Sequence, residues 1–341
     1  MAENNTPAKP ADALSARKGF TFRDFILNYY AIVFLVVLFI VACIASPLFL
    51  TSKNMNTIMR QQGAYLVIAL GMLMIIITGG IDLAASATVA LASILMVVAA
   101  SNWGFGTLGC IIVALVMGLV IGAFNGVCVA WLRIPAFIVT LALSYIGQGI
   151  AFMITKGNTL LLDTGSKVYE NLVYPGFASV SIPGLNIPLT FVVAIIFFVI
   201  FLLLMKYTKF GRLVYAVGSN ENAVRLAGIN SKKILFLVYL LEGFLCAVAG
   251  VLLTCRTGNA SALTSSGDYA LSCVAAVVIG GASLAGGEGT VIMTVVGVFV
   301  IAIIGNIMNL IGLPSYPQMV VKGAVIILAV VLKGFSSKSQ G

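Results

Sequence analysis

Residues 211–233 read GRLVYAVGSNENAVRLAGINSKK and form a polar, basic segment in a chain that is otherwise mostly apolar. Ser219 or Asn220 can cap a short helix, because a side-chain oxygen there accepts from the free N–H groups of the first turn. Glu221 lies in that first turn, where the helix dipole favours a negative charge. Gly228 ends the helix, since glycine takes the left-handed conformation at little cost. The segment therefore predicts a short helix on the protein surface.

This predicted helix presents small apolar side chains inside a connecting segment, which indicates a docking surface for another protein. An ordinary cytoplasmic loop held by lipid headgroups is the alternative that shape alone leaves open. The residues predicted to form the surface are Ser219, Asn220, Glu221, Ala223, Arg225, Leu226, Ala227 and Gly228.

The composition of the whole chain excludes a soluble protein. The 341 residues are 61% hydrophobic and only 9% charged. Several apolar stretches reach the roughly 17 to 25 residues that a helix needs to cross a bilayer, and 35 glycines are typical of tightly packed membrane helices. The chain is therefore predicted to be an all-α polytopic membrane protein in contact with lipid. Its net charge of +9 reflects cytoplasmic loops and does not indicate nucleic-acid binding.

Hydropathy predicts about ten transmembrane helices. They are expected at residues 30–50, 63–79, 84–101, 107–130, 136–154, 188–205, 234–254, 269–283, 291–311 and 318–334. Residues 1–29 are predicted to be a cytoplasmic tail with a surface segment, 30–334 the transmembrane domain, 206–233 its cytoplasmic loop, and 335–341 a second cytoplasmic tail. With both termini in the cytoplasm, most of the 19 lysines and arginines lie on the cytoplasmic side, as the positive-inside rule requires.

Two glycine-rich segments interrupt the apolar pattern. Residues 78–84, TGGIDLA, and 279–290, IGGASLAGGEGT, share the pattern Gly-Gly-x-x-Leu-Ala. Broken helices with glycine near a charged residue often line pathways or gates, because the freed backbone groups must face protein or water. Tight interfacial turns are the alternative interpretation.

Ionisable and amide side chains within the predicted spans are the other candidates for a transport path. Glu242 lies near the middle of a span, where a carboxylate is costly, so it is expected to face the protein interior or a water-filled path. Embedded amides such as Asn306 and Asn309 can bind a neutral polar solute or join helix to helix. Asp268 and Lys322 are expected at external span edges, where snorkelling explains them. The predicted path or gate residues are Gly79, Gly80, Asp82, Asn125, Glu242, Gly280, Gly281 and Asn306.

The sequence contains no motif for catalysis. It has no G-x-x-x-x-G-K-[ST] loop for nucleotide binding and no histidine. Its six cysteines form no C-x-x-C pair, so no metal or redox site is expected and they are interpreted as small packing residues. The chain is therefore predicted not to be an enzyme, not to hydrolyse ATP itself and to bind no cofactor of its own.

Several of these segments resemble the permease subunits of ribose-type (monosaccharide) ABC importers, a family shared with branched-chain amino-acid permeases. TGGIDLAASATVALAS is similar to a conserved glycine segment of that family, and residues 210–233 resemble its cytoplasmic coupling loop. Residues 275–298 and 318–323 resemble two further motifs in the same order. Glu242 departs from the family pattern, which usually has serine before Gly243.

The resemblance implies a type II importer fold in the bacterial cytoplasmic (inner) membrane. It implies a homodimer, or a dimer with a close paralogue, on a cytoplasmic ABC ATPase with two fused ATP-binding halves. ATP and Mg would be used by that ATPase, and an external solute-binding protein would deliver a monosaccharide or similar neutral solute. The helix 221–228 would be the coupling helix that enters a groove of the ATPase.

Two other functions remain open at this point. A branched-chain amino-acid importer shares the glycine pattern, although no cation lies deep in the predicted spans to meet a zwitterion. An ion-coupled secondary transporter that uses Glu242 is the alternative from a different class.

Overall fold

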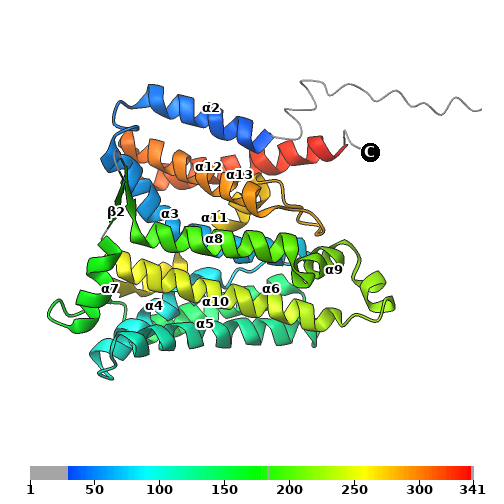
Figure 1. The fold of residues 1–341 in the computed structure, drawn as a ribbon, viewed down its shortest axis with the longest axis horizontal. Helices are drawn as coiled ribbons and strands as arrows, with labels where there is room; N and C mark the ends of the chain where they lie inside the picture. The colour runs from blue at the N-terminus through cyan, green and yellow to red at the C-terminus, as the bar shows by residue number, and fades with distance from the viewer. Residues whose placement is uncertain (1–29, 178, 183–184, 339–341) are drawn as a thin grey trace, which may run out of the picture.

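The computed structural model describes residues 30–177, 179–182 and 185–338, so the predictions for residues 1–29 and 339–341 lie outside the described residues. Helices run roughly side by side along the length of the molecule (Figure 1). The helices are α2 (Tyr30–Ala45), α3 (Ser52–Ile77), α4 (Ala85–Ser101), α5 (Thr107–Ala130), α6 (Ala136–Thr155), α7 (Lys167–Phe177), α8 (Leu189–Tyr207), α9 (Lys209–Leu226), α10 (Ser231–Thr257), α11 (Tyr269–Ile279), α12 (Val291–Leu310) and α13 (Ser315–Lys338). Short strands and a 3₁₀ helix complete the chain: β1 (Thr159–Leu161), β2 (Ser179–Ile182), β3 (Leu185–Pro188), β4 (Asn259–Ser261) and η1 (Ala262–Ser266).

The apolar helices confirm an all-α polytopic membrane protein. Seven candidate spans in the described part are long and apolar enough to cross a bilayer, and α2 and α4 are shorter apolar helices. Four strands of three or four residues pair as β1 with β4 and β2 with β3, both antiparallel. They add only small hairpin-like pairings to a helical bundle.

Two helices differ from the predicted spans. The span expected at 63–79 belongs to a longer helix, α3, which begins at Ser52 because the Thr51 hydroxyl accepts from the Asn54 N–H at 3.3 Å. The span expected at 269–283 contains only the 11-residue helix α11, which ends at Ile279 before the Gly280-Gly281 break. Together with the preceding 3₁₀ helix η1 it forms the 18-residue candidate span Ala262–Ile279.

Glycines bring α5 and α10 into close contact. Gly118, Gly122 and Gly126 follow one another at four-residue intervals, so they share one face of α5. A Cβ at Gly243 of α10 would overlap the carbonyl oxygen of Gly118, so only glycine fits there. Small residues at such spacing let membrane helices approach backbone to backbone.

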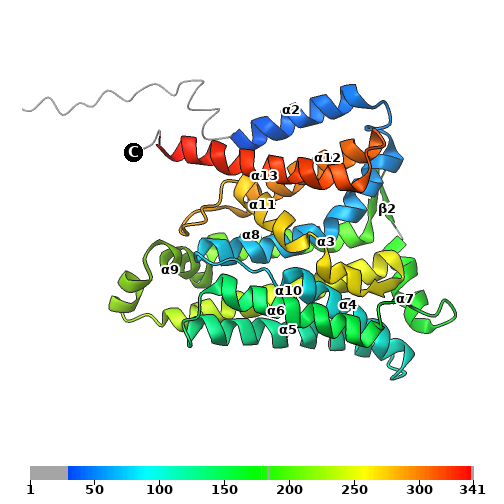
Figure 2. The same cartoon turned by 180° about the vertical axis from the view of Figure 1, so that it is seen from behind.

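The interior of the bundle is built around α3. Its residues from Leu66 to Ile77 are buried, and it packs against α8, α10, α11 and α12. The view from behind shows α3 crossing the middle of the molecule (Figure 2). The α9 segment lies at one end of the bundle, and α7 and β2 lie at the opposite end (Figures 1 and 2).

The glycine contact between α5 and α10 predicts that one added methyl group at Gly243 lowers the stability of the protein, whereas one at Gly149 does not. Gly243→Ala forces two backbones apart, and overpacking of this kind costs about 1–3 kcal/mol. Gly149→Ala is the matched control, because a Cβ at Gly149 of α6 meets nothing within 4 Å. Thermal unfolding of the purified protein in detergent should show a lower midpoint for Gly243→Ala alone. Equal midpoints for the two variants would contradict the close contact.

Candidate transport site and coupling surface

The two glycine-rich breaks meet in space, although about 200 residues separate them in the chain. The backbone N–H of Gly287 donates to the carbonyl oxygen of Ile77, the last residue of α3, at 2.8 Å. Gly79 and Gly286 both have positive φ, of 79° and 91°. A Cβ at Gly286 would lie 3.2 Å from the N atom of Gly79. The breaks are thus parts of one contact between backbones.

A third segment, from α9, completes this contact. A Cβ at Gly218 would overlap the carbonyl oxygen of Ile77, so α9 lies directly against the end of α3. The hydroxyl of Tyr215, one turn earlier in α9, donates to the carbonyl oxygen of Gly289 at 2.7 Å. We call this meeting point of Ile77, Gly79, Gly218, Gly286 and Gly287 the glycine junction. It connects α9 physically with both breaks.

The predicted surface helix is the second half of α9. The helix bends at Asn220, which is extended, with φ −162° and ψ 95°. Asn220 rather than Ser219 caps the second half, because its Oδ1 accepts from the Ala223 N–H at 3.0 Å. Gly228 follows the last turn with φ 78°. Ser219 lies instead against Gly287 at the glycine junction.

Glu221 ties this second half to the loop before α6 and to the first residue of α10. Its carboxylate pairs with the Arg133 guanidinium at 2.7 Å and accepts from the Ser231 hydroxyl at 2.7 Å. Partial burial raises the pKa of Glu221, but the hydrogen bonds from Ser231 and Arg133 and the charges of Arg133 and Arg225 outweigh burial, so the pKa lies below its ordinary value. Glu221 is therefore ionised at neutral pH, and the pairing is lost only when the pH falls through the lowered pKa.

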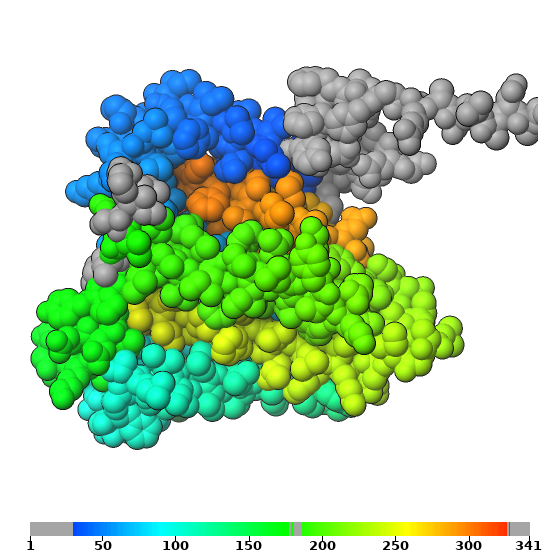
Figure 3. Space-filling model, in the orientation of Figure 1, coloured from blue at the N-terminus to red at the C-terminus, as the bar shows by residue number. Residues whose placement is uncertain are grey.

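The opposite face of this helix is open. Ala223, Leu226 and Ala227 are exposed there, with 89% of Leu226 accessible, while Val224 is buried. Arg225 is exposed too, but it lies four residues after Glu221 and so on the side of Glu221. Figure 3 shows the region that contains α9 (yellow-green) as a projection at one end of the molecule. Nothing else in the described part of the chain covers this apolar face.

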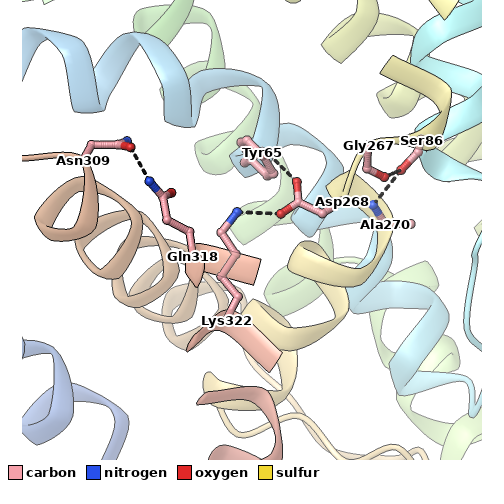
Figure 4. A network of polar contacts seen from close by, with 8 residues as sticks. All are labelled: Tyr65, Ser86, Gly267, Asp268, Ala270, Asn309, Gln318 and Lys322. Atoms are coloured by element: carbon pink, nitrogen blue, oxygen red, sulfur yellow. Dashed lines mark hydrogen bonds and ion pairs between the residues drawn. The ribbon is translucent and has the colours of Figure 1, made fainter. Parts of the chain in front are cut away.

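Two helix N-termini meet in the other half of the molecule (Figure 4). The Ser86 hydroxyl, in the first turn of α4, donates to the Gly267 carbonyl at 3.0 Å and accepts from the Ala270 N–H at 3.0 Å. It thereby satisfies a free N–H group at the start of α11. The segments before α4 and before α11 are therefore tied to each other by this hydroxyl.

A polar hollow of about 110 Å³ lies beside this meeting point, between the first half of α3, the last half of α12 and the first turns of α13. Its polar lining residues are Gln61, Gln62, Tyr65, Ser272, Asn306, Asn309, Gln318 and Lys322. Asn306 is a predicted path residue. Its amide exchanges hydrogen bonds with Asn54 at 2.9 and 2.8 Å.

The other predicted path residues do not line the polar hollow. The Asp82 carboxylate accepts from the Ala84 N–H at 2.7 Å just before α4. Glu242 is fully buried against Gly71 of α3, where any Cβ would overlap its carboxylate, and it accepts from the Cys246 thiol at 3.5 Å. Asn125 is buried in α5. The predicted set therefore divides into separate places.

The remaining predicted glycines pack against helices. Gly80 lies against the hydroxyl of Tyr239, and Gly280 lies against the Met293 backbone of α12. Gly281 has φ 93°. Together with Gly79 they shape the ends of α3 and α11, and they do not face the polar hollow.

Sequence reasoning missed most of the hollow. Gln61, Gln62 and Tyr65 lie before or at the start of the span expected at 63–79, so they were not assigned to a helix interior. Asp268 and Lys322 were expected to snorkel at span edges, and in the structure they form a partly exposed ion pair of 2.6 Å with each other. The available signal was spacing, because Gln318 and Lys322 are four residues apart and share one helix face.

These features define a class of protein: a membrane transport subunit with interrupted helices inside the bundle and an exposed capped helix at one end. The family described as "Branched-chain amino acid transport system / permease component" matches residues 54–330. The chain belongs to this family, as its motifs had indicated.

Individual relatives give the same result. The ribose import permease protein of Escherichia coli strain K12 is 36% identical over 94% of this chain and 97% of its own length. The ribose import permease protein of Bacillus subtilis strain 168 is 36% identical over 87% and 90%. The xylose transport system permease protein of Haemophilus influenzae is 32% identical over 83% and 89%. No solved structure matched the chain.

Family membership makes the chain the permease subunit of an importer, not an enzyme. A permease of this kind implies two partners, an ATPase and a solute-binding protein. The multi-pass helical structure agrees with that role.

The glycine junction generates a prediction about Tyr215. Tyr215→Phe removes the hydrogen bond to Gly289, and the loss of one neutral hydrogen bond should lower the free energy of unfolding by about 0.5–1.5 kcal/mol. Tyr207→Phe is the matched control, since Tyr207 is 64% exposed on α8. Thermal unfolding in detergent measures both. An unchanged midpoint for Tyr215→Phe would show that this hydroxyl does not hold α9 to the break.

Proposed function

We propose that this chain is the membrane-spanning subunit of an ATP-driven importer that carries a monosaccharide or a similar neutral polar solute. The observation that carries the proposal is the 36% identity with a ribose import permease over 94% of the chain. A fructose import permease of Bifidobacterium longum is also 36% identical, over 81% of the chain. Relatives named for three different sugars support the class of substrate and leave the particular sugar open.

The proposed assembly follows from this role. The chain has ten transmembrane helices with both termini in the cytoplasm of a bacterium, and it resides in the inner membrane. It pairs with a second copy or a close paralogue. A cytoplasmic ATPase with two fused halves binds ATP and Mg, while this chain binds no cofactor. The solute-binding protein docks at the end of the bundle that carries β2 and α7.

The exposed half of α9 is the proposed coupling helix. Its open apolar face offers a surface to the ATPase, and Glu221 fixes its inner side to Arg133 and Ser231. Movement of this helix reaches the end of α3 and the loop between α11 and α12 because α9 contacts both at the glycine junction. The ATPase thus shifts the permease between two states that differ in their contacts with the solute.

The two alternative functions are less well supported. A branched-chain amino acid is a zwitterion and needs unpaired charges, but Lys322 beside the hollow is paired with Asp268. An ion-coupled transporter needs Glu242 on an open path, whereas its carboxylate packs against Gly71. The ion pair therefore does not favour an amino-acid importer, and the position of Glu242 does not favour an ion-coupled transporter.

Reconstitution tests the proposed function directly. Proteoliposomes that contain the permease with its cognate ATPase and binding protein should transport labelled ribose, xylose or fructose when ATP is supplied on the side of the membrane that carries the ATPase. The same vesicles should not import labelled leucine. Permease alone under an ion gradient should import nothing, and uptake by the permease alone would overturn the ATP-driven mechanism.

The coupling surface predicts loss of the ATPase from one variant. Leu226→Glu places a charge on the open apolar face, and a buried unpaired charge at an interface costs several kcal/mol. The ATPase should no longer co-purify with this variant. Leu161→Glu is the matched control, because Leu161 is 69% exposed on β1 at the opposite end. An ATPase retained equally by both variants would remove α9 from the interface.

A further inference from the structure

We propose that the polar hollow between α3, α12 and α13 binds the imported solute during its passage, as a site for an uncharged polyhydroxylated molecule. This inference rests on the proposed function and adds the place of contact. The hollow measures about 110 Å³, whereas a single water needs only about 10–15 Å³ of such space. It therefore has room for a group several times larger than one water.

The wall of the hollow is rich in carboxamides. Gln61, Gln62, Asn306, Asn309 and Gln318 come from three different helices. Each carboxamide has two N–H donors and an acceptor oxygen, and each sugar hydroxyl both donates and accepts. The wall therefore matches the hydrogen-bonding pattern of a polyol rather than that of an anion or a cation.

Gln62 is the strongest pointer to a ligand. Only 8% of it is exposed, its side chain makes no hydrogen bond to the described part of the chain, and it lines the hollow. Its amide atoms are not among the fully enclosed polar atoms that lack a partner, so they open onto the hollow, where a bound group can reach them. A solute hydroxyl in the hollow would satisfy both its donor and its acceptor.

Neighbouring amides are held in place and so form a fixed wall. The Gln318 side-chain N–H₂ group donates to the Asn309 amide oxygen at 2.9 Å (Figure 4). It also donates to the Leu313 carbonyl oxygen at 2.8 Å. Asn306 is fixed by its reciprocal pair with Asn54. Side chains that are already oriented lose little entropy when a ligand binds.

The charges beside the hollow cancel each other. The Lys322 ammonium lies 2.6 Å from the Asp268 carboxylate, which also accepts from the Tyr65 hydroxyl at 3.2 Å (Figure 4). With both charges engaged, the wall offers dipoles instead of a net charge. This favours a neutral solute over an amino acid.

A larger cavity elsewhere does not fit a polar solute. It measures about 370 Å³ between α5, α7, α8 and α10, but valine, leucine, isoleucine and phenylalanine side chains form most of its wall. Polar groups that leave water need replacement hydrogen bonds, and this wall supplies few. Volume alone therefore does not identify the site.

The test compares uptake and ATP hydrolysis in proteoliposomes that contain the complete complex with its ATPase and binding protein. Gln62→Leu removes the unpaired carboxamide at similar volume. Sites that hydrogen-bond a hydroxyl depend strongly on that bond, so we expect uptake of the transported labelled sugar to fall at least about tenfold. Binding-protein-stimulated ATP hydrolysis should persist, because α9 and the glycine junction are untouched.

Thr190→Val is the matched control, since it removes a buried hydroxyl that has no partner in the described part and lines the apolar cavity. It should import sugar at the native rate. Gln61→Leu, at an exposed position on the wall, should lower uptake as well and serves if Gln62→Leu does not assemble.

The outcomes separate this inference from the proposed function. Native uptake by Gln62→Leu, or a parallel loss of uptake and ATP hydrolysis in an assembled complex, overturns the hollow as a binding site. If the Gln62→Leu complex does not assemble, native uptake by Gln61→Leu overturns the hollow as a binding site instead. A native complex that imports no sugar overturns the proposed function itself.

Discussion

The hydrogen bond between the Gly287 N–H and the Ile77 carbonyl fixes the contact on which the arrangement of the bundle depends. Three backbones converge there, and a Cβ at Gly218 or Gly286 would collide with, or press closely against, the carbonyl of Ile77. Without these glycines α9 could not lie against the end of α3, and the break after α11 could not reach it. A side-chain-free contact of this kind transmits movement directly, because no flexible rotamer lies between the backbones.

Hydropathy was sufficient to predict the class of fold, because long apolar segments have few structural options in a bilayer. It located α5, α8 and α12 within a few residues. It failed at α3, whose polar first turns contain Gln61 and Gln62, and at α11, where a glycine pair ends the helix early. In α3 tertiary contacts decide, because Gln62 is buried where other helices pack against it.

The candidate site was only partly predictable for the same reason. The cap at Asn220 and the stop at Gly228 follow from local chemistry, which the sequence displays directly. The meeting of the two glycine breaks is a contact between distant segments, and no local rule gives it. Glu242 attracted attention because a buried carboxylate is costly, but the space left by Gly71 accommodates it between helices. An embedded polar residue alone does not distinguish helix packing from a path.

α3 gives the two functional regions a common mechanical element. Gln62 in its first half lines the polar hollow, and Ile77 at its end accepts the hydrogen bond of the glycine junction. The 26 residues of α3 span about 39 Å, and the buried stretch from Leu66 to Ile77 is held by α8, α10, α11 and α12. A packed helix moves as a rigid body rather than by local bending. Under the proposed function, displacement of α9 at one end of α3 would therefore change the hollow at the other end, which is the coupling that an ATP-driven permease requires.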